Sequence, residues 1–473
     1  MTQRFAPLVL VAMLACDGAT RDASLAAVSS SNAGISVLLV TVDTLRADHL
    51  STYGYPRVTS PNIDALASRG VAFDIAFTYW PKTRGSFASL FTGVYASQHG
   101  LTVRERDLPE FNQTLAETFR DAGYRTAAAL DNGNLDAALG FAQGFDTYEQ
   151  TWQVEGSDEL SRTEAITRFG ESYLGASDDE RPFFLWLHYV NPHTPYEPTD
   201  EALARFRGDG IIPRGPELAR VTGYHGGVNK KHVAVDGENY WGDYIDRYDA
   251  EIFISDEHLG RVLKALSESE HASTTLVVFT SDHGESLGEH DYYFDHGFDL
   301  FNPSLRIPLI LSFPGMLPAG ERVSGAVSSL DVFPTILDVA QVSYPSGLEG
   351  KSVLPLVRGT TNRLHEQVFF QNDRHQMAIS NGRLKLVHYP DDRFELYDMY
   401  RDPTEDVDRY AGSEPIIEPF KAELSSFRTQ TVAWQQATTA RREAEGAAAV
   451  DDSELSEKTR RMLCDLGYID CEK

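Results

Sequence analysis

Cysteine is scarce in this chain of 473 residues, which contains only Cys16, Cys464 and Cys471. The long body of the sequence between the first and the second therefore has no thiol. This excludes a disulfide framework and a zinc site built on cysteines from the main part of the protein. Pairing of Cys464 with Cys471 stays open, because a sequence does not give their separation, and we favour incidental positions for both.

Basic side chains are also in short supply. The chain has 42 lysines and arginines against 70 aspartates and glutamates, which gives a net charge of −28. A surface of this sign repels polyanions, so the composition disfavours binding to nucleic acid. An anionic substrate would meet the same repulsion, and its site would need a bound cation and locally placed Arg, Lys or His.

Long hydrophobic runs are missing as well. The apolar residues 5–15 follow Arg4 and are too short for a permanent transmembrane helix, so they indicate a secretion signal. Met13-Leu14-Ala15-Cys16 is similar to the processing box of bacterial lipoproteins, in which the cysteine is lipidated; ordinary signal-peptide cleavage nearby is the alternative. We expect an exported protein, lipid-anchored in the bacterial cell envelope or periplasm.

Apolar runs alternate with helical patterns through most of the chain, which predicts an α/β fold with a central sheet flanked by helices. Strands are expected near 37–42, 125–130, 183–189, 275–281 and 307–313, and helices over 61–69, 112–122, 240–269 and 331–340. Shorter alternating pieces at 367–371, 376–380, 384–388 and 394–397 predict a small C-terminal antiparallel sheet. The amphipathic stretch 458–468 is expected to pack against the domain.

These patterns divide the chain into four parts. We predict a signal peptide over 1–16, a flexible tether rich in Ala and Ser over 17–34, a catalytic domain over 35–360, and a C-terminal subdomain with a helical tail over 361–473.

Acidic residues end two of the predicted strands. Asp43 follows the aliphatic run 37–42, and Ser281-Asp282-His283-Gly284-Glu285 follows the run 275–279. Open α/β sheets place their chemistry at the carboxyl ends of strands, so two such acids and a histidine predict a bound metal. Capping of helices or contact with solvent is the alternative for either acid alone.

Several strings in this part of the chain resemble, in the same order, the sulfatases of the alkaline-phosphatase superfamily. They are VLLVTVDTLRADHLSTYGY, SPNIDALASRGVAF, TGVYASQHG, FFLWLHYVNPHTPY, SDHGESLGEHDYYFDHG, SLRIPLIL and FELYDMYRDPTED, and they run from about Val37 to about Asp408. The resemblance implies an alkaline-phosphatase-like fold and a metal-dependent hydrolase that cleaves sulfuric ester bonds, or phosphoric ester bonds.

The nucleophile departs from the family pattern. The resemblance implies a C-x-P-S-R motif whose first residue is oxidised to formylglycine, but counting back from Thr92-Gly93 puts Thr83 there, with Gly85 for the Pro and Phe87 for the Arg. Threonine cannot yield formylglycine, so none is expected. A hydroxyl at a helix start beside a cation can still act as a nucleophile; a simple helix cap, or lost activity, is the alternative.

The resemblance also implies the remaining site residues. The metal ligands would be Asp43, Thr83, Asp282 and His283, for one divalent cation, calcium first, with magnesium, manganese or zinc as alternatives. Asp48 is an outside candidate, and Thr44 stands where many sulfatases have a second ligating Asp. The catalytic set would be Thr83, His193, His290 and His296, with His296 preferred for protonating the leaving oxygen.

The chain lacks some of the cationic residues that bind the substrate in many sulfatases. Many sulfatases carry Gly-Lys-Trp-His where this chain has the segment 130–135. Asn132 or Asn134 would instead supply neutral hydrogen-bond donors to the substrate, and Arg84 would supply a charged one. The substrate is expected to be an anionic ester, on a glycan or a lipid. The alternatives are a phosphodiesterase or phosphotransferase with a Thr nucleophile that acts on envelope lipids or glycans, and a non-catalytic protein that binds sulfated glycans.

The expected lipid anchor is testable on Cys16. Cys16→Ser removes the thiol that would carry the lipid, so lipid labelling should be lost and the protein should move to the soluble fraction. Fractionation of cells that express both forms checks this. Unchanged membrane retention of the variant would exclude the anchor.

Overall fold

The computed structural model describes residues 34–101, 107–154, 159–176, 179–218, 227–228, 239–410, 415–446, 450, 452–466 and 468–469. The expected signal peptide, the tether up to residue 33, Cys16 and Cys471 lie outside these ranges. Cys464, which was expected to be incidental, is disulfide-bonded. No helix within the described ranges has the length and apolar character that crossing a bilayer requires.

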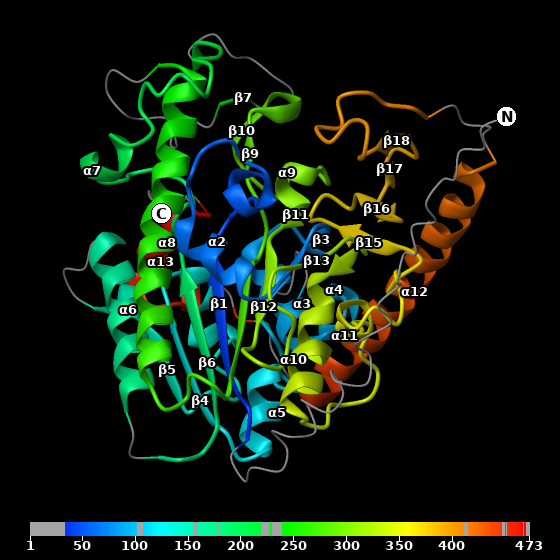
Figure 1. Ribbon diagram of the computed structural model, residues 1–473. Coiled ribbons are helices and arrows are strands. Elements are labelled where there is room, and N and C mark those ends of the chain that lie inside the picture. The colour runs from blue at the N-terminus through cyan, green and yellow to red at the C-terminus, as the bar shows by residue number, and fades with distance from the viewer. Residues whose placement is uncertain are drawn as a thin grey trace, which may run out of the picture.

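An eight-stranded sheet runs through the main domain in the order β13-β2-β12-β8-β1-β6-β4-β5 (Figure 1). Strands β8, β1, β6, β4 and β5 are parallel, and β12 is antiparallel to both of its neighbours. The bounds are β1 Ser36–Val42, β2 Val71–Phe73, β4 Arg125–Leu130, β5 Thr147–Gln150, β6 Phe183–Tyr189, β8 Thr275–Ser281, β12 Leu309–Ser312 and β13 Glu321–Val323.

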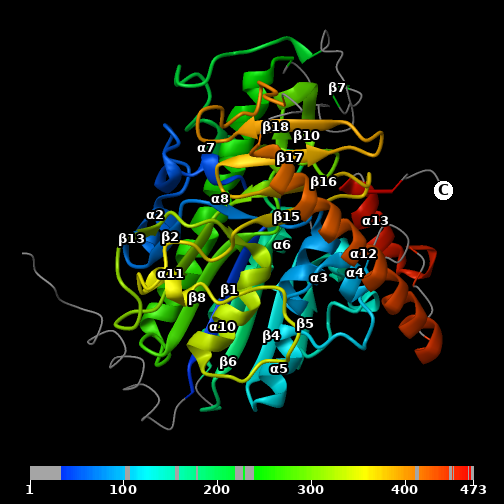
Figure 2. The same ribbon diagram turned by 90° about the vertical axis from the view of Figure 1, so that its right-hand side faces the viewer.

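Helices cover both faces of this sheet, which explains why every residue of β1, β6 and β8 is buried. Successive residues of β1 enter different cores, because side chains alternate along a strand: Val37 and Leu39 lie in one, and Leu38 and Val40 in the other. One face is covered by α2 (Pro61–Ser68), α6 (Glu159–Gly175) and α8 (Trp241–Glu268), and the other by α3 (Thr83–Thr92), α5 (Leu115–Asp121) and α10 (Val332–Ala340) (Figures 1 and 2).

A small antiparallel sheet follows in the C-terminal part. Its strands are β15 (Val368–Gln371), β16 (Met377–Ser380), β17 (Leu384–His388) and β18 (Phe394–Asp398), in that order. The long helix α12 (Ile417–Glu445) packs on one side of it through Ile417, Phe420 and Leu424 (Figure 2). The other side packs against Phe77 and Leu305 of the main domain.

A buried ion pair inside the C-terminal part is hydrogen-bonded to Asn302 of the main domain. Lys385 Nζ lies 2.6 Å from Glu405 Oε1, both side chains are fully buried, and the same ammonium donates to Asn302 Oδ1 at 3.2 Å. Burial lowers the pKa of Lys385. Removing one partner of such a pair leaves a buried charge and typically costs about 3–5 kcal/mol. Asn302 also donates its backbone N–H to Glu405 Oε2 at 2.7 Å, so it contacts both members of the pair.

The predicted fold class is confirmed, with differences in detail. The expected strand 307–313 is divided into β11 (Arg306–Ile307) and β12, and Pro308 between them has no N–H for a ladder hydrogen bond. The amphipathic stretch near the end forms α13 (Glu457–Asp465), which packs as expected through buried Met462 and Leu463. Short strands such as β2 and β13 carry too few residues for a pattern to show.

Candidate active site

The carboxyl edge of the sheet brings the two strand-end acids together. Val42 of β1 pairs with Ser281 of β8 in a parallel register, so Asp43 and Asp282 leave adjacent strands at the same level. Both side chains are completely buried. This is the arrangement that the sequence predicts for a metal site.

Asp43, Asp282 and His283 each point one ligand atom at the same place. These atoms lie within 4.8 Å of one another. Asp43 Oδ1 and Asp282 Oδ2 have no hydrogen-bond partner in the described part of the chain. His283 donates from Nδ1 to the Gly284 carbonyl at 2.9 Å, which leaves the Nε2 lone pair directed at the carboxylates. The donor set therefore fits a divalent cation.

The electrostatics of Asp43 and Asp282 also favour a bound cation. Burial, and next the charge of Asp43, raise the pKa of Asp282 to about 6. Thr44, next to Asp43 in the chain, has a φ of 51°, a strained value for a β-branched residue, and its N–H donates to Asp282 Oδ1 at 3.3 Å. The repulsion between the two buried acids is a cost that a bound cation would offset.

Thr83 stands at the edge of this cluster as the first residue of α3. Its hydroxyl oxygen is 3.3 Å from His283 Nε2, and its side chain is buried. A helix N-terminus directs free N–H groups and a positive field at this position, which favours an oxyanion and an anionic substrate. The structure thus brings all four predicted metal ligands together.

The two departures from the family motif have a packing explanation. A Cβ on Gly85 would lie 2.6 Å from Trp80 Cδ1, so the indole ring occupies the space that a larger residue would need. Phe87 faces the core, with its ring centroid 5.1 Å from that of Trp186 and 4.9 Å from that of His188. Position 87, where the motif has an Arg, therefore supplies no cation to the site.

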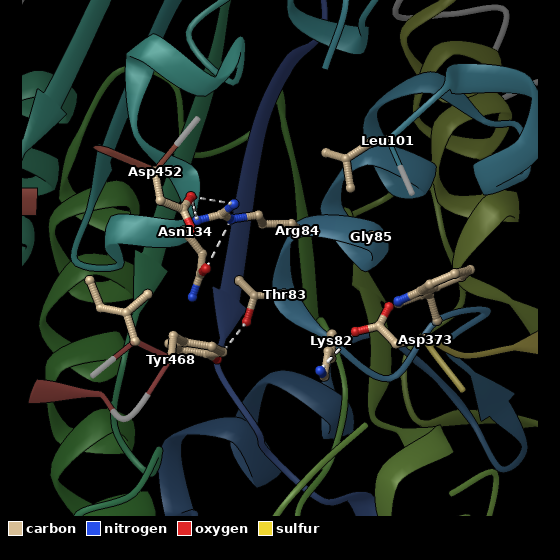
Figure 3. Close-up of a pocket in the computed structure, with 11 residues that line it drawn as sticks. Lys82, Thr83, Arg84, Gly85, Leu101, Asn134, Asp373, Asp452 and Tyr468 are labelled. Carbon is tan, nitrogen blue, oxygen red and sulfur yellow. Dashed lines mark hydrogen bonds and ion pairs between the residues drawn. The ribbon is translucent and has the colours of Figure 1, made fainter. Parts of the chain in front are cut away.

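A cavity of about 160 Å³ opens beside Thr83 (Figure 3). Two basic side chains line it, and each has an acidic partner: Arg84 lies 3.2 Å from Asp452 Oδ1, and Lys82 lies 2.8 Å from Asp373 Oδ2. Arg84 also donates from Nε to Asn134 Oδ1 at 3.0 Å. The amide nitrogen of Asn134 is buried with no partner among the described residues, so it can donate to a substrate.

Two of the predicted histidines line a second cavity, of about 260 Å³. His193 donates from Nδ1 to the Thr194 carbonyl at 2.6 Å, and His296 Nδ1 lies 3.4 Å from Glu285 Oε2. The ring centroid of His296 is 5.2 Å from that of His193 and 4.3 Å from that of His283. The structure therefore brings His193 and His296, two members of the predicted catalytic set, close to each other, with His296 beside the metal-ligand candidate His283.

Other predicted positions lie elsewhere. His290 lines neither cavity: it lies in a turn with a φ of 54°, stacks on Phe301 at 3.7 Å and bonds the Thr404 carbonyl at 2.9 Å. Asn132 donates its amide to Asp43 Oδ2 at 2.5 Å, so it holds a predicted metal ligand, and it lines neither cavity. The outside candidate Asp48 pairs with Arg46 at 2.8 Å.

The sequence analysis assigned no role to three side chains that lie near the cluster. His188, the only charged-type residue inside the apolar run of β6, has Nε2 at 3.6 Å from Asp43 Oδ2. Glu285 is fully buried, and burial raises its pKa. Tyr468, from the C-terminal segment, has its hydroxyl 3.2 Å from Thr83 Oγ1. The polar interruption of a buried strand was a usable signal for His188, whereas nothing in the tail marked Tyr468.

Comparison with known proteins shows the family of this chain. The sulfatase family model matches residues 36–342, and a model described as N-sulphoglucosamine sulphohydrolase, C-terminal, matches residues 288–430. An arylsulfatase of Clostridium perfringens is 27% identical over 441 residues, which cover 78% of this chain and 89% of the relative.

Two solved structures share the fold. One is a complex with the substrate D-glucosamine-2-N,6-O-disulfate, with a TM-score of 0.70, 21% identity, and coverage of 85% of this chain and 98% of that one. The other is the phosphonate monoester hydrolase of Agrobacterium radiobacter, with a TM-score of 0.69, 22% identity, and coverage of 84% and 96%. Since the sulfatase model spans well over half of the sequence, the chain belongs to the sulfatase family and is a hydrolase of ester bonds.

Proposed function

We propose that Thr83 is the unmodified nucleophile of this esterase, and that the enzyme cleaves phosphate esters in preference to sulfate esters. The observation that carries the proposal is the position of the Thr83 hydroxyl, at the start of α3 and 3.3 Å from His283 Nε2. Attack by threonine leaves an ester on the enzyme, which water must then hydrolyse. A phosphoryl-threonine survives more readily than a labile sulfo-threonine, which favours phosphate.

One divalent cation would be held by Asp43, Asp282, His283 and Thr83, with calcium as the first candidate. The family generally binds a divalent metal, and three of the four donors offered here are oxygens. The His283 nitrogen leaves manganese, zinc and magnesium as alternatives. When bound, the cation supplies positive charge that lowers the pKa of the Thr83 hydroxyl and neutralises the ester.

Protonation of the leaving oxygen is assigned to His296. Its Nδ1 lies 3.4 Å from Glu285 Oε2, which orients the ring so that a proton on Nε2 can be given to the leaving oxygen. Asn134 supplies a neutral donor to the ester oxygens from the cavity beside Thr83. Since Arg84 and Lys82 are each paired with a carboxylate, the remaining cavity attracts anions only weakly without the cation.

The natural substrate is proposed to be an anionic ester on a glycan. Support comes from the similar structure that holds a sulfated amino sugar as its substrate, and from a cavity that opens directly beside the nucleophile. We further propose that the protein is exported and lipid-anchored, which rests on residues 5–15 and Cys16.

The metal ligands are testable on Asp282. Asp282→Ala removes a buried carboxylate whose Oδ2 faces the cluster, so the purified protein should lose its stoichiometric metal and its esterase activity together. Asp48→Ala is the matched control, because Asp48 pairs with Arg46 outside the cluster, and it should keep the metal. Metal analysis of both variants decides, and stoichiometric metal in Asp282→Ala would show that the ligand assignment is wrong.

The nucleophile is testable on Thr83. Thr83→Ala should lower kcat/KM for 4-nitrophenyl phosphate by about 10³-fold or more, whereas Thr83→Ser, which keeps a hydroxyl, should retain part of the activity. Thr92→Ala deletes the hydroxyl at the other end of the same helix and should change the rate by less than about twofold.

Mass spectrometry of the protein quenched during turnover provides a second measurement. The covalent phosphoryl group should map to the peptide that contains Thr83. Near-normal turnover in Thr83→Ala, or an adduct on a peptide without Thr83, would contradict the proposal.

A further inference from the structure

The hydroxyl oxygen of Tyr468 lies among the three side chains assigned to the reaction. It is 3.2 Å from Thr83 Oγ1, 3.0 Å from His193 Nε2 and 3.2 Å from His296 Nε2. Figure 3 shows the ring of Tyr468 directed at Thr83 from the C-terminal segment. A phenol offers one donor and two acceptor positions, so three contacts use its full hydrogen-bonding capacity.

The proton of the Thr83 hydroxyl needs a route to a base when its oxygen attacks. Among the described residues, His283 and Tyr468 are the side chains that lie within hydrogen-bond distance of Thr83 Oγ1. The Nε2 lone pair of His283 faces the cation site, and a lone pair that binds a cation does not accept a proton. Tyr468 is therefore the neighbour through which the proton can leave.

His193 is placed to receive a proton on the other side of Tyr468. Its Nδ1–H is donated to the Thr194 carbonyl at 2.6 Å, so in the neutral ring Nε2 is an acceptor. That acceptor is the atom 3.0 Å from the Tyr468 hydroxyl. A continuous path thus leads from the Thr83 hydroxyl, through the phenol, to a neutral imidazole.

The segment that carries Tyr468 follows a helix that is packed tightly against the main domain. Helix α13, which precedes it, buries Met462 and Leu463 in the core of the main domain. Thr459 of the same helix donates to Asp136 Oδ2 at 2.5 Å and accepts from Trp152 Nε1 at 3.2 Å, and Cys464 is disulfide-bonded. Core packing and the Thr459 hydrogen bonds hold α13, and the segment that follows it, against the main domain.

We propose that Tyr468 is a catalytic residue that relays the proton of Thr83 to His193. The proton on Thr83 Oγ1 passes to Tyr468 Oη while the phenol's own proton passes to His193 Nε2. A protonated phenol can accept one proton while it gives up another, so no tyrosinate has to form. The Thr83 oxygen forms its bond to phosphorus, the bond from phosphorus to the leaving oxygen breaks, and that oxygen keeps the electron pair and takes a proton from His296. The inference rests on the proposed role of Thr83.

The test is Tyr468→Phe in the full-length, metal-loaded enzyme, with single-turnover kinetics on 4-nitrophenyl phosphate. The variant keeps the ring and loses only the hydroxyl, so formation of the Thr83 adduct should slow by about 10²-fold. KM, metal content and Tm should stay near the wild-type values, which separates a relay from a packing role. Tyr400→Phe, at an exposed tyrosine, is the matched control and should behave as the wild type.

The double variant Tyr468→Phe/His193→Ala provides a second measurement. Two members of one relay should not have additive effects, so the double variant should be about as slow as the slower single variant. If the fold-losses in rate of the two single variants multiply in the double variant, the relay is overturned. A Tyr468→Phe enzyme that is as fast as the wild type or faster would also overturn it. If Thr83→Ala is inactive while Tyr468→Phe is not impaired, the relay alone fails; full activity in Thr83→Ala overturns the proposed function and the relay with it.

Discussion

The repulsion between two buried carboxylates is the constraint on which the site depends. Asp43 and Asp282 follow adjacent parallel strands, both are excluded from water, and each has one oxygen without a hydrogen-bond partner among the described residues. Two like charges a few ångströms apart repel by roughly 3–4 kcal/mol at an effective dielectric constant of about 20, and both also lose hydration. A cation held between them would offset both costs, which is why the two acids together support the proposed metal site.

The rest of the site is arranged around that cation. Helix α3 brings the hydroxyl of Thr83 to the open side of the cluster, and the apolar packing of Phe87 fixes the helix against the sheet. The nearby basic residues contribute little net charge, because Arg84 pairs with Asp452 and Lys82 with Asp373. On this proposal an anionic ester would be held by the cation, by the helix N-terminus and by neutral donors.

The sequence predicted those parts of the site that lie beside a strong local pattern. Asp43 and Asp282 end long apolar runs, and a buried parallel sheet brings such ends to one edge, so their meeting followed from the pattern. His290 shows where this reasoning stops: it lies between Gly288 and His296 in the chain, but a left-handed turn directs its ring to Phe301. Backbone turns of this kind are decided by packing, which spacing does not show.

Long-range contacts were the other part that the sequence did not reveal. Tyr468 reaches Thr83 across 385 positions of the chain, and Asp452 reaches Arg84 across 368. Both depend on the docking of α13, whose amphipathic pattern predicted packing but not the surface on which it packs.

The measurement that tests the central claim most directly is anomalous diffraction from manganese-loaded crystals. The account predicts one peak within about 2.0–2.6 Å of Asp43, Asp282, His283 and the Thr83 hydroxyl; a peak elsewhere, or one that the Thr83 oxygen does not reach, would contradict it.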